Sequence, residues 1–178
     1  MASVSRLGKQ IEEVIATLNA MGDGYALIGG LALASHKVIR ATQDVDLLTD
    51  ADAADRIHAA LTNLGYSCAH RSADAANYLR GDERVDFLFA SRPIARRLLA
   101  DAAQHTTLFG VLRVISAEGL IGFKLQGLVN DPRRTQDLED IRSLMRANRA
   151  TLNMDEIREY FRIFEREPLL IELLNATE

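Results

Sequence analysis

Apolar residues recur every three or four positions in both the first and the last part of the chain. From Ser5 to Met21 this spacing, with charged residues in between, predicts an amphipathic helix. The same spacing dominates everything after Ser116 and predicts a helical C-terminal region. The expected helices are 5–21, 31–38, 52–64, one beginning at 91–93, 117–129, 135–147, 155–166 and 168–174.

Short apolar or alternating runs predict strands between these helices. Gly81-Asp82 separates two such runs and is typical of a hairpin turn. The run around Gly110 predicts either a second hairpin or one bent strand. The expected strands are 25–28, 44–48, 66–70, 77–80, 84–89 and the segment 106–115.

The order of these elements predicts an α+β fold in which a mixed sheet is flanked by helices. We expect residues 1–115 to form the sheet core with the N-terminal helix, and residues 116–178 to form a helical region packed on it as one compact unit. A chain of 178 residues can bury about 70% of its unfolded surface, so it needs no disulfide or structural metal to hold a core. No repeat or linker divides it.

Composition narrows the classes of partner. The formal net charge of −4 argues against broad, non-specific adhesion to nucleic acid or to anionic membranes. The sequence has no run of about 18 apolar residues, which a membrane-spanning helix would need. The single cysteine, Cys68, permits no internal disulfide and favours a cytoplasmic location; its strand predicts a buried, inert thiol.

Two aspartates two positions apart provide the main chemical signal. In a strand, Asp44 and Asp46 place both carboxylates on one face while Val45 and Leu47 point into the core. Such a pair repels itself unless a cation or a basic group lies between the oxygens, and a hard divalent ion such as Mg²⁺ or Mn²⁺ would suit that position. Asp86 repeats the pattern, so three carboxylates converge if the two strands are neighbours.

Each of these features has a simpler explanation. Pairs of acidic residues two apart are common on exposed strands and in turns, where they bind only water. Gly29-Gly30 lies between a strand and a helix, where backbone N–H groups could approach a phosphate. The same pair could equally form a tight strand-to-helix turn.

Taken together, these residues resemble the signature of the polymerase-β-like nucleotidyltransferase superfamily. The branch they resemble most is that of the AbiEii-type toxins and related small bacterial nucleotidyltransferases. The resemblance implies a mixed sheet, an NTP and Mg²⁺ in a cleft, and a third acid for which Asp86 is the candidate. The matching positions are Ile28-Gly29-Gly30, Arg40, Thr42 and Asp44-Val45-Asp46-Leu47.

A second block, from Glu118 to Ile141, resembles the family's lysine-bearing helix and a later acidic helix. By this resemblance Lys124 would point at the triphosphate, although an ordinary solvated lysine is an equal alternative. Asp137 and Asp140 share a helix face and could hold Lys124 or an arginine, or could face water. Gln136 departs from the family, which usually has a basic residue there.

The resemblance implies transfer of a nucleoside monophosphate from an NTP to a hydroxyl acceptor, with release of pyrophosphate. The acceptor could be tRNA, a protein or a small molecule, and the protein could be the toxin of a toxin–antitoxin pair with a cognate antitoxin as partner. A catalytically silent protein of this fold, binding nucleotide or a partner, is the alternative. The expected catalytic residues are Asp44, Asp46, Asp86 and Lys124, with the three aspartates as metal ligands; the expected substrate-binding residues are Gly29, Gly30, Arg40, Thr42, Asp137 and Asp140.

Overall fold

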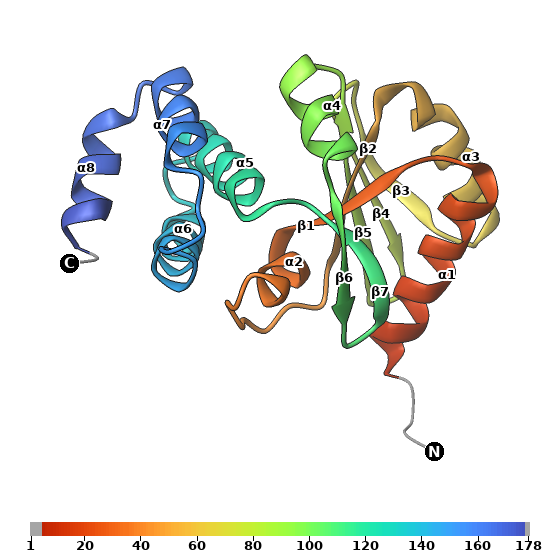
Figure 1. Ribbon diagram of the computed structural model, residues 1–178. Coiled ribbons are helices and arrows are strands. Elements are labelled where there is room, and N and C mark those ends of the chain that lie inside the picture. The colour runs from red at the N-terminus through yellow and green to blue at the C-terminus, as the bar shows by residue number, and fades with distance from the viewer. Residues whose placement is uncertain (1–4, 177–178) are drawn as a thin grey trace. The chain divides into compact units, whose positions relative to one another are not determined.

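The computed structural model describes residues 5–176 and divides into two compact units (Figure 1). The first unit, called here the sheet unit, contains the described residues up to Ala32 together with Arg40–Ile115. The second, the helical unit, contains Leu33–Ile39 and the described residues from Ser116 onward. The packing of one unit on the other stays a prediction.

One mixed sheet of seven strands forms the centre of the sheet unit, in the order β3-β4-β5-β2-β1-β7-β6. β2 pairs with β5, and β1 with β7, in parallel; the other neighbours are antiparallel. The mixed α+β fold expected from the sequence is confirmed. The strands are β1 (Tyr25–Ile28), β2 (Val45–Asp50), β3 (Ser67–Arg71), β4 (Ala75–Arg80), β5 (Glu83–Ala90), β6 (Ala103–Thr107) and β7 (Gly110–Val114).

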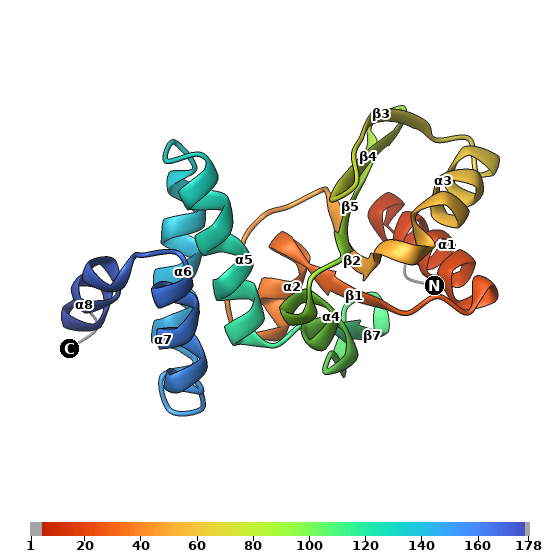
Figure 2. The same cartoon turned by 90° about the horizontal axis from the view of Figure 1, so that it is seen from above.

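Helices α1 (Arg6–Met21) and α3 (Ala54–Asn63) lie on one face of this sheet, and α4 (Pro93–Ala100) lies on the other (Figure 2). Side chains along the central strands alternate between the two faces of the sheet, so each face presents side chains to the helices that cover it. Leu47 and Phe87 are register partners that are fully buried, and Tyr78 bonds to His58 of α3 from the same face. The intervening positions, which include Asp46 and Asp86, therefore point to the face opposite α1 and α3.

Local capping sets where the helices begin and end. The Ser5 hydroxyl accepts a hydrogen bond from the Gly8 amide at 3.0 Å and starts α1, which ends at Gly22 in the left-handed conformation. Ser116 caps the Gly119 amide in the same way at 3.0 Å. Two further short helical elements are α2 (Gly29–Ser35) and the 3-10 helix η1 (Ala51–Ala53).

Four helices follow Ser116 and bury a common apolar stripe. Ile121 and Leu125 of α5 contribute to this core together with Ile141, Leu144 and Phe161, all of them completely inaccessible to solvent. The helical character expected for this region is confirmed. The helices are α5 (Ala117–Asn130), α6 (Thr135–Ala147), α7 (Met154–Ile163) and α8 (Glu167–Asn175).

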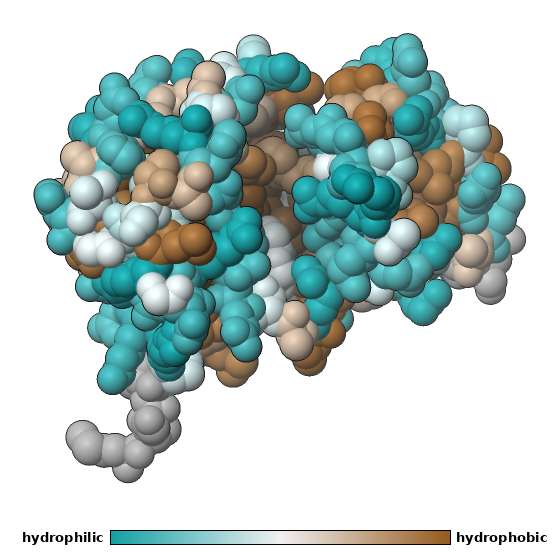
Figure 3. Space-filling view, turned by 180° about the vertical axis from the view of Figure 1, so that it is seen from behind, coloured by the Kyte–Doolittle hydropathy of each residue, from teal (hydrophilic) through white to brown (hydrophobic). Residues whose placement is uncertain are grey.

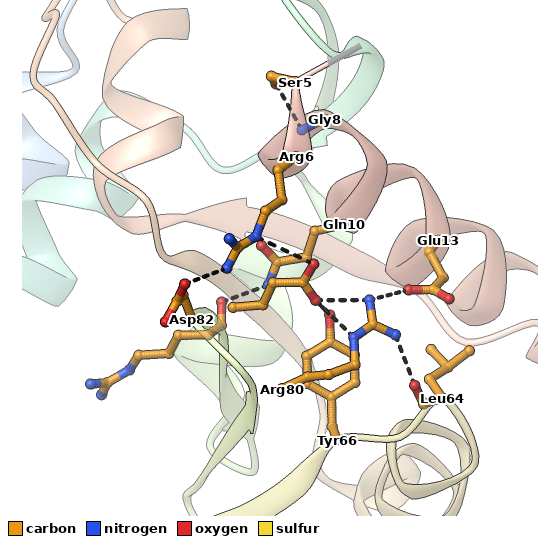
Figure 4. A network of polar contacts seen from close by, with 11 residues as sticks. Ser5, Arg6, Gly8, Gln10, Glu13, Leu64, Tyr66, Arg80 and Asp82 are labelled. Atoms are coloured by element: carbon orange, nitrogen blue, oxygen red, sulfur yellow. Dashed lines mark hydrogen bonds and ion pairs between the residues drawn. The ribbon is translucent and has the colours of Figure 1, made fainter.

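A polar network around Arg80 joins α1, the end of α3 and the β4–β5 hairpin (Figure 4). The guanidinium donates to Glu13 at 2.6 Å, to Glu83 at 2.8 Å and to the Leu64 carbonyl at 2.8 Å. It also lies 4.3 Å from the centre of the Tyr66 ring, whose hydroxyl donates to Glu83 at 3.1 Å. This network fixes the turn end of the β4–β5 hairpin, which contains Asp86.

The predicted strands are present, with ends that differ from the expected ones by up to three residues. The Gly81-Asp82 turn joins β4 to β5 with Arg80 opposite Glu83. The segment around Gly110 is a hairpin and not one bent strand. The prediction of a buried Cys68 is wrong: its thiol is exposed, because every residue of β3 is exposed at the edge of the sheet.

The surface seen from behind is mainly hydrophilic, with apolar residues scattered among polar ones (Figure 3). Within residues 5–176, no helix combines the length and the apolar character that crossing a membrane would require.

Tyr66 provides a pH test of the network around Arg80. Burial raises the pKa of the Tyr66 phenol to about 12, from an ordinary value of about 10. Because the folded-state pKa is the higher one, the stability linked to this proton is complete below pH 10 and is lost as the pH rises toward 12. In a near-ultraviolet titration, the wild-type protein should show a phenolate step near pH 12 that the Tyr66→Phe variant lacks. A Tyr66-dependent step at the ordinary value would contradict the burial.

Candidate active site

The parallel pairing of β2 with β5 brings two of the predicted site residues side by side. Asp46 and Asp86 are direct register partners, and both side chains are half-buried on the face opposite α1 and α3. Asp44 lies one residue before β2 and is exposed. The strand alternation expected for Asp46 and Asp86 is therefore present, but the prediction that Asp44 also lies in this strand is wrong, because β2 begins at Val45 and Asp44 belongs to the segment that leads into it.

A guanidinium lies among these carboxylates. Arg84 donates through Nε to both oxygens of Asp86, at 3.0 Å to Oδ1 and 2.9 Å to Oδ2. The hydrogen bond and the charge of Asp86 raise the pKa of Arg84, and the charges of Asp44 and Asp46 raise it further. All three carboxylates thus act electrostatically on one arginine.

Asn77 supplies a second, neutral donor to the same carboxylate. It lies opposite Asp86 in the β4–β5 hairpin, and its Nδ2 donates to Asp86 Oδ1 at 2.8 Å. The backbone of Arg84 is held in turn, because Gln10 of α1 donates to its carbonyl at 3.0 Å. Asp86 is therefore oriented by two side chains from the hairpin.

The two glycines at the end of β1 allow the aspartate segment to approach closely. Gly29 has φ +67°, and a Cβ placed on it would lie 2.1 Å from Asp46 Oδ2. A Cβ on Gly30 would lie 2.9 Å from the Thr42 side chain. Only glycine fits at Gly29, since both the backbone angle and the space exclude a side chain. The glycine pair and the residues Thr42 and Asp46 are thus one sterically linked motif.

Arg40 and Thr42 belong to the irregular segment between α2 and β2. Thr42 contacts the glycine turn as described, and Arg40 is half-buried. Their proposed contact with substrate stays a prediction.

Lys124 lies in the helical unit, inside a cluster of opposite charges. Its ammonium is 2.6 Å from Asp140 Oδ2 and 3.2 Å from Asp137 Oδ1, and the three side chains are at most 8% exposed. Arg134 also pairs with Asp137, at 2.6 Å. Of the alternatives left open by the sequence, Asp137 and Asp140 therefore hold Lys124 rather than face water. The role of Lys124 toward a triphosphate stays a prediction.

Gln136 completes this cluster as a neutral member. Its Nε2 donates to Asp140 Oδ1 at 3.0 Å. The amide satisfies a buried carboxylate oxygen without adding charge.

Sequence reasoning did not single out Arg84 and Asn77, although a signal for both was present. Arg84 is two residues before Asp86 in one strand and therefore shares its face. The two-residue turn pairs Arg80 with Glu83, and this register places Asn77 opposite Asp86.

Gly29→Ala should lower stability more than Gly81→Ala. Both glycines have positive φ, +67° and +60°, so both variants carry the same backbone strain, whereas a Cβ at Gly81 would meet nothing within 4 Å. The difference in unfolding free energy therefore reports the clash with Asp46, for which we expect about 1–3 kcal/mol. Urea unfolding of both variants measures it, and equal losses would show that Gly29 is not packed against Asp46.

Lys124→Met should lower the unfolding free energy by about 3–5 kcal/mol, because it removes the ammonium that pairs with the buried carboxylates of Asp137 and Asp140. Lys9→Met, which removes an exposed lysine, is the control and should have an effect within about 0.5 kcal/mol. Thermal and urea unfolding of both variants provide the measurement. A Lys124 variant as stable as the control would contradict the buried cluster.

Comparison with known proteins places this geometry in a recognised fold. Residues 10–86, which contain the glycine turn and all three aspartates, match the family model of aminoglycoside-2''-adenylyltransferase. No sequence of a curated protein matches the chain.

Solved structures agree over most of the chain. The solution structure of the antibiotic-resistance factor ANT(2'')-Ia superposes with a TM-score of 0.67 at 16% identity, covering 99% of this chain and 100% of that one. Its crystal structure in complex with adenylyl-2''-tobramycin gives 0.66 at 17% identity, covering 90% and 98%. The lincomycin-bound lincosamide antibiotic adenylyltransferase LnuA gives 0.58 at 15% identity, covering 79% and 96%.

The chain therefore has the polymerase-β-like nucleotidyltransferase fold, as the resemblance of its motifs implied, and its matching family model is that of an antibiotic adenylyltransferase and not of an AbiEii-type toxin.

Proposed function

We propose that the protein is a nucleotidyltransferase that transfers a nucleoside monophosphate from an NTP to a hydroxyl group of a small molecule. The observation that carries this proposal is the register pairing of Asp46 with Asp86 beside the Gly29 turn, within a nucleotidyltransferase fold. The acceptor hydroxyl attacks the α-phosphate, the bond to pyrophosphate breaks, and the hydroxyl proton passes to a base.

The class of acceptor follows from the matched proteins. The family model is named for an aminoglycoside adenylyltransferase, and the structures include complexes with adenylyl-2''-tobramycin and with lincomycin. These names support a small, hydroxyl-bearing, antibiotic-like acceptor. They give no support to tRNA, a protein or a cognate antitoxin as partner, or to a toxin role.

The aspartates fit a divalent cation in donor type. Carboxylate oxygens are the ligands that Mg²⁺ and Mn²⁺ prefer, and a guanidinium already acts as a cation among them. As arranged in residues 5–176, no three His, Cys, Asp or Glu side chains form a group that could hold a metal ion. Asp44, Asp46 and Asp86 are the residues that would hold Mg²⁺ or Mn²⁺, and the metal would neutralise charge on the phosphates.

The chain's own residues then have separate tasks. Asp86 is held by Asn77 and can serve as third ligand or as the base that takes the acceptor proton. Gly29 and Gly30 leave the end of β1 free of side chains, so that the aspartate segment and the phosphates can approach the backbone. Lys124 remains the proposed electrostatic partner of the triphosphate, in which case it would have to act from within its ion-pair cluster.

Asp44→Asn combined with Asp46→Asn should abolish transfer. We expect a loss of at least about two to three orders of magnitude, as for the removal of other groups that stabilise transition-state charge. The assay incubates the protein with labelled NTPs, Mg²⁺ or Mn²⁺, and a panel of aminoglycosides, lincosamides and tRNA, and follows adenylylated product and pyrophosphate.

Asp101→Asn, which removes an exposed carboxylate at the end of α4, is the control and should retain full activity. Nucleotide transfer that persists in the double variant would contradict the roles proposed for Asp44 and Asp46. Metal-dependent NTP binding without transfer to any acceptor would instead favour a catalytically silent protein.

A further inference from the structure

The Arg84 guanidinium holds the carboxylate of Asp86, which is one of the proposed metal ligands. Its Nε is within 3.0 Å of both oxygens of the Asp86 carboxylate, so the pairing uses one lone pair on each oxygen. Asn77 uses a further lone pair on Oδ1. One lone pair, on Oδ2, is left for a cation, and a cation bound there would lie beside the Arg84 guanidinium.

The two hydrogen-bond partners of Asp86 differ in whether they are compatible with a cation bound to that carboxylate. Asn77 is neutral and donates to a single oxygen, so its hydrogen bond is compatible with a metal ion on the other oxygen. Arg84 carries a full positive charge that would repel a nearby divalent ion. Exchange of partners would therefore involve Arg84 and leave Asn77 in place.

The side chain of Arg84 has the freedom that such an exchange requires. It is 47% exposed, whereas that of Asp86 is 20% exposed. Its backbone, by contrast, is fixed within β5 and by the hydrogen bond from Gln10. The guanidinium can turn away to solvent while the strand and Asp86 stay in register.

We infer that Arg84 is a built-in counter-cation of the aspartate cluster, which competes with the divalent metal and leaves Asp86 when the metal binds. This inference rests on the proposed metal site but not on the nature of the acceptor. Arg84 is a positioning residue here, because it acts through Asp86 and not on the substrate. Its positive charge offsets part of the repulsion among the three neighbouring carboxylates in the metal-free protein.

Mn²⁺ binding to the full chain tests this inference without any need for activity. Arg84→Gln should bind Mn²⁺ about three- to tenfold more tightly than the wild type, since it removes both the competing ion pair and the repelling charge. The free-ion electron paramagnetic resonance signal of Mn²⁺ measures the affinity. Arg84→Lys, which retains the charge, should return the affinity toward the wild-type value.

Two controls separate this effect from others. Arg92→Gln removes one exposed positive charge beyond the far end of β5 and should leave Mn²⁺ affinity unchanged. Asp46→Asn in the Arg84→Gln background should abolish the gain. Circular dichroism of each variant verifies that it is folded.

Equal or weaker Mn²⁺ binding by Arg84→Gln would overturn the inference, as would the absence of binding in both proteins. Binding by Arg84→Gln alone would support it. The proposed function is judged separately: a wild-type enzyme that transfers nucleotide while Arg84→Gln has unchanged affinity would retain the function and refute only the role of Arg84.

Discussion

Like charges held on one face of a sheet must be compensated, and this constraint organises the candidate site. The parallel pairing of β2 with β5 places Asp46 directly beside Asp86, and Asp44 precedes the same strand. Carboxylates so close together repel one another unless a cation or hydrogen-bond donors act on them. In this protein the compensation comes from Arg84 and Asn77, both presented by the β4–β5 hairpin. That hairpin is in turn fixed to α1 and α3 by the network around Arg80.

Steric fit connects the glycine turn to the same residues. Gly29 must lack a side chain because Asp46 lies against it, and Gly30 because Thr42 does. Residues 12 and 17 positions apart in the sequence are therefore linked by packing. This physical link explains why a glycine pair, a threonine and an aspartate occur together as one motif, independently of any phosphate that the turn could also bind.

Much of this could be predicted from the sequence, and what could not has a physical cause. The periodicity from Ser5 to Met21 and the Gly81-Asp82 turn are local signals, and the structure confirms both elements. The parallel register of Asp46 with Asp86 is not local, because the strands are joined by a long connection whose length does not fix their alignment. From the sequence, convergence of the three carboxylates could be predicted only on the condition that the two strands are neighbours. The structure shows that they are. Cys68 shows the same limit: an apolar strand does not reveal that it lies at a sheet edge.

Lys124 illustrates how burial narrows the alternatives for a charged residue. Spacing in the sequence allowed it to be solvated, paired, or directed at a triphosphate, and its side chain is in fact paired with Asp137 and Asp140 at 8% exposure. Removal of an ammonium so enclosed would destabilise the helical unit, whatever else Lys124 does, because the buried carboxylates would lose a partner.

The central claim is that the aspartate cluster beside the glycine turn is a cation and nucleotide site. A crystal structure of the protein with Mn²⁺ and a non-hydrolysable ATP analogue, with the metal located by its anomalous signal, tests it most directly. We predict metal density at Asp44 and Asp46, with the analogue's phosphates beside Gly29 and Gly30. Ordered nucleotide and metal bound away from these residues, with the Asp86–Arg84 pair unchanged, would contradict it.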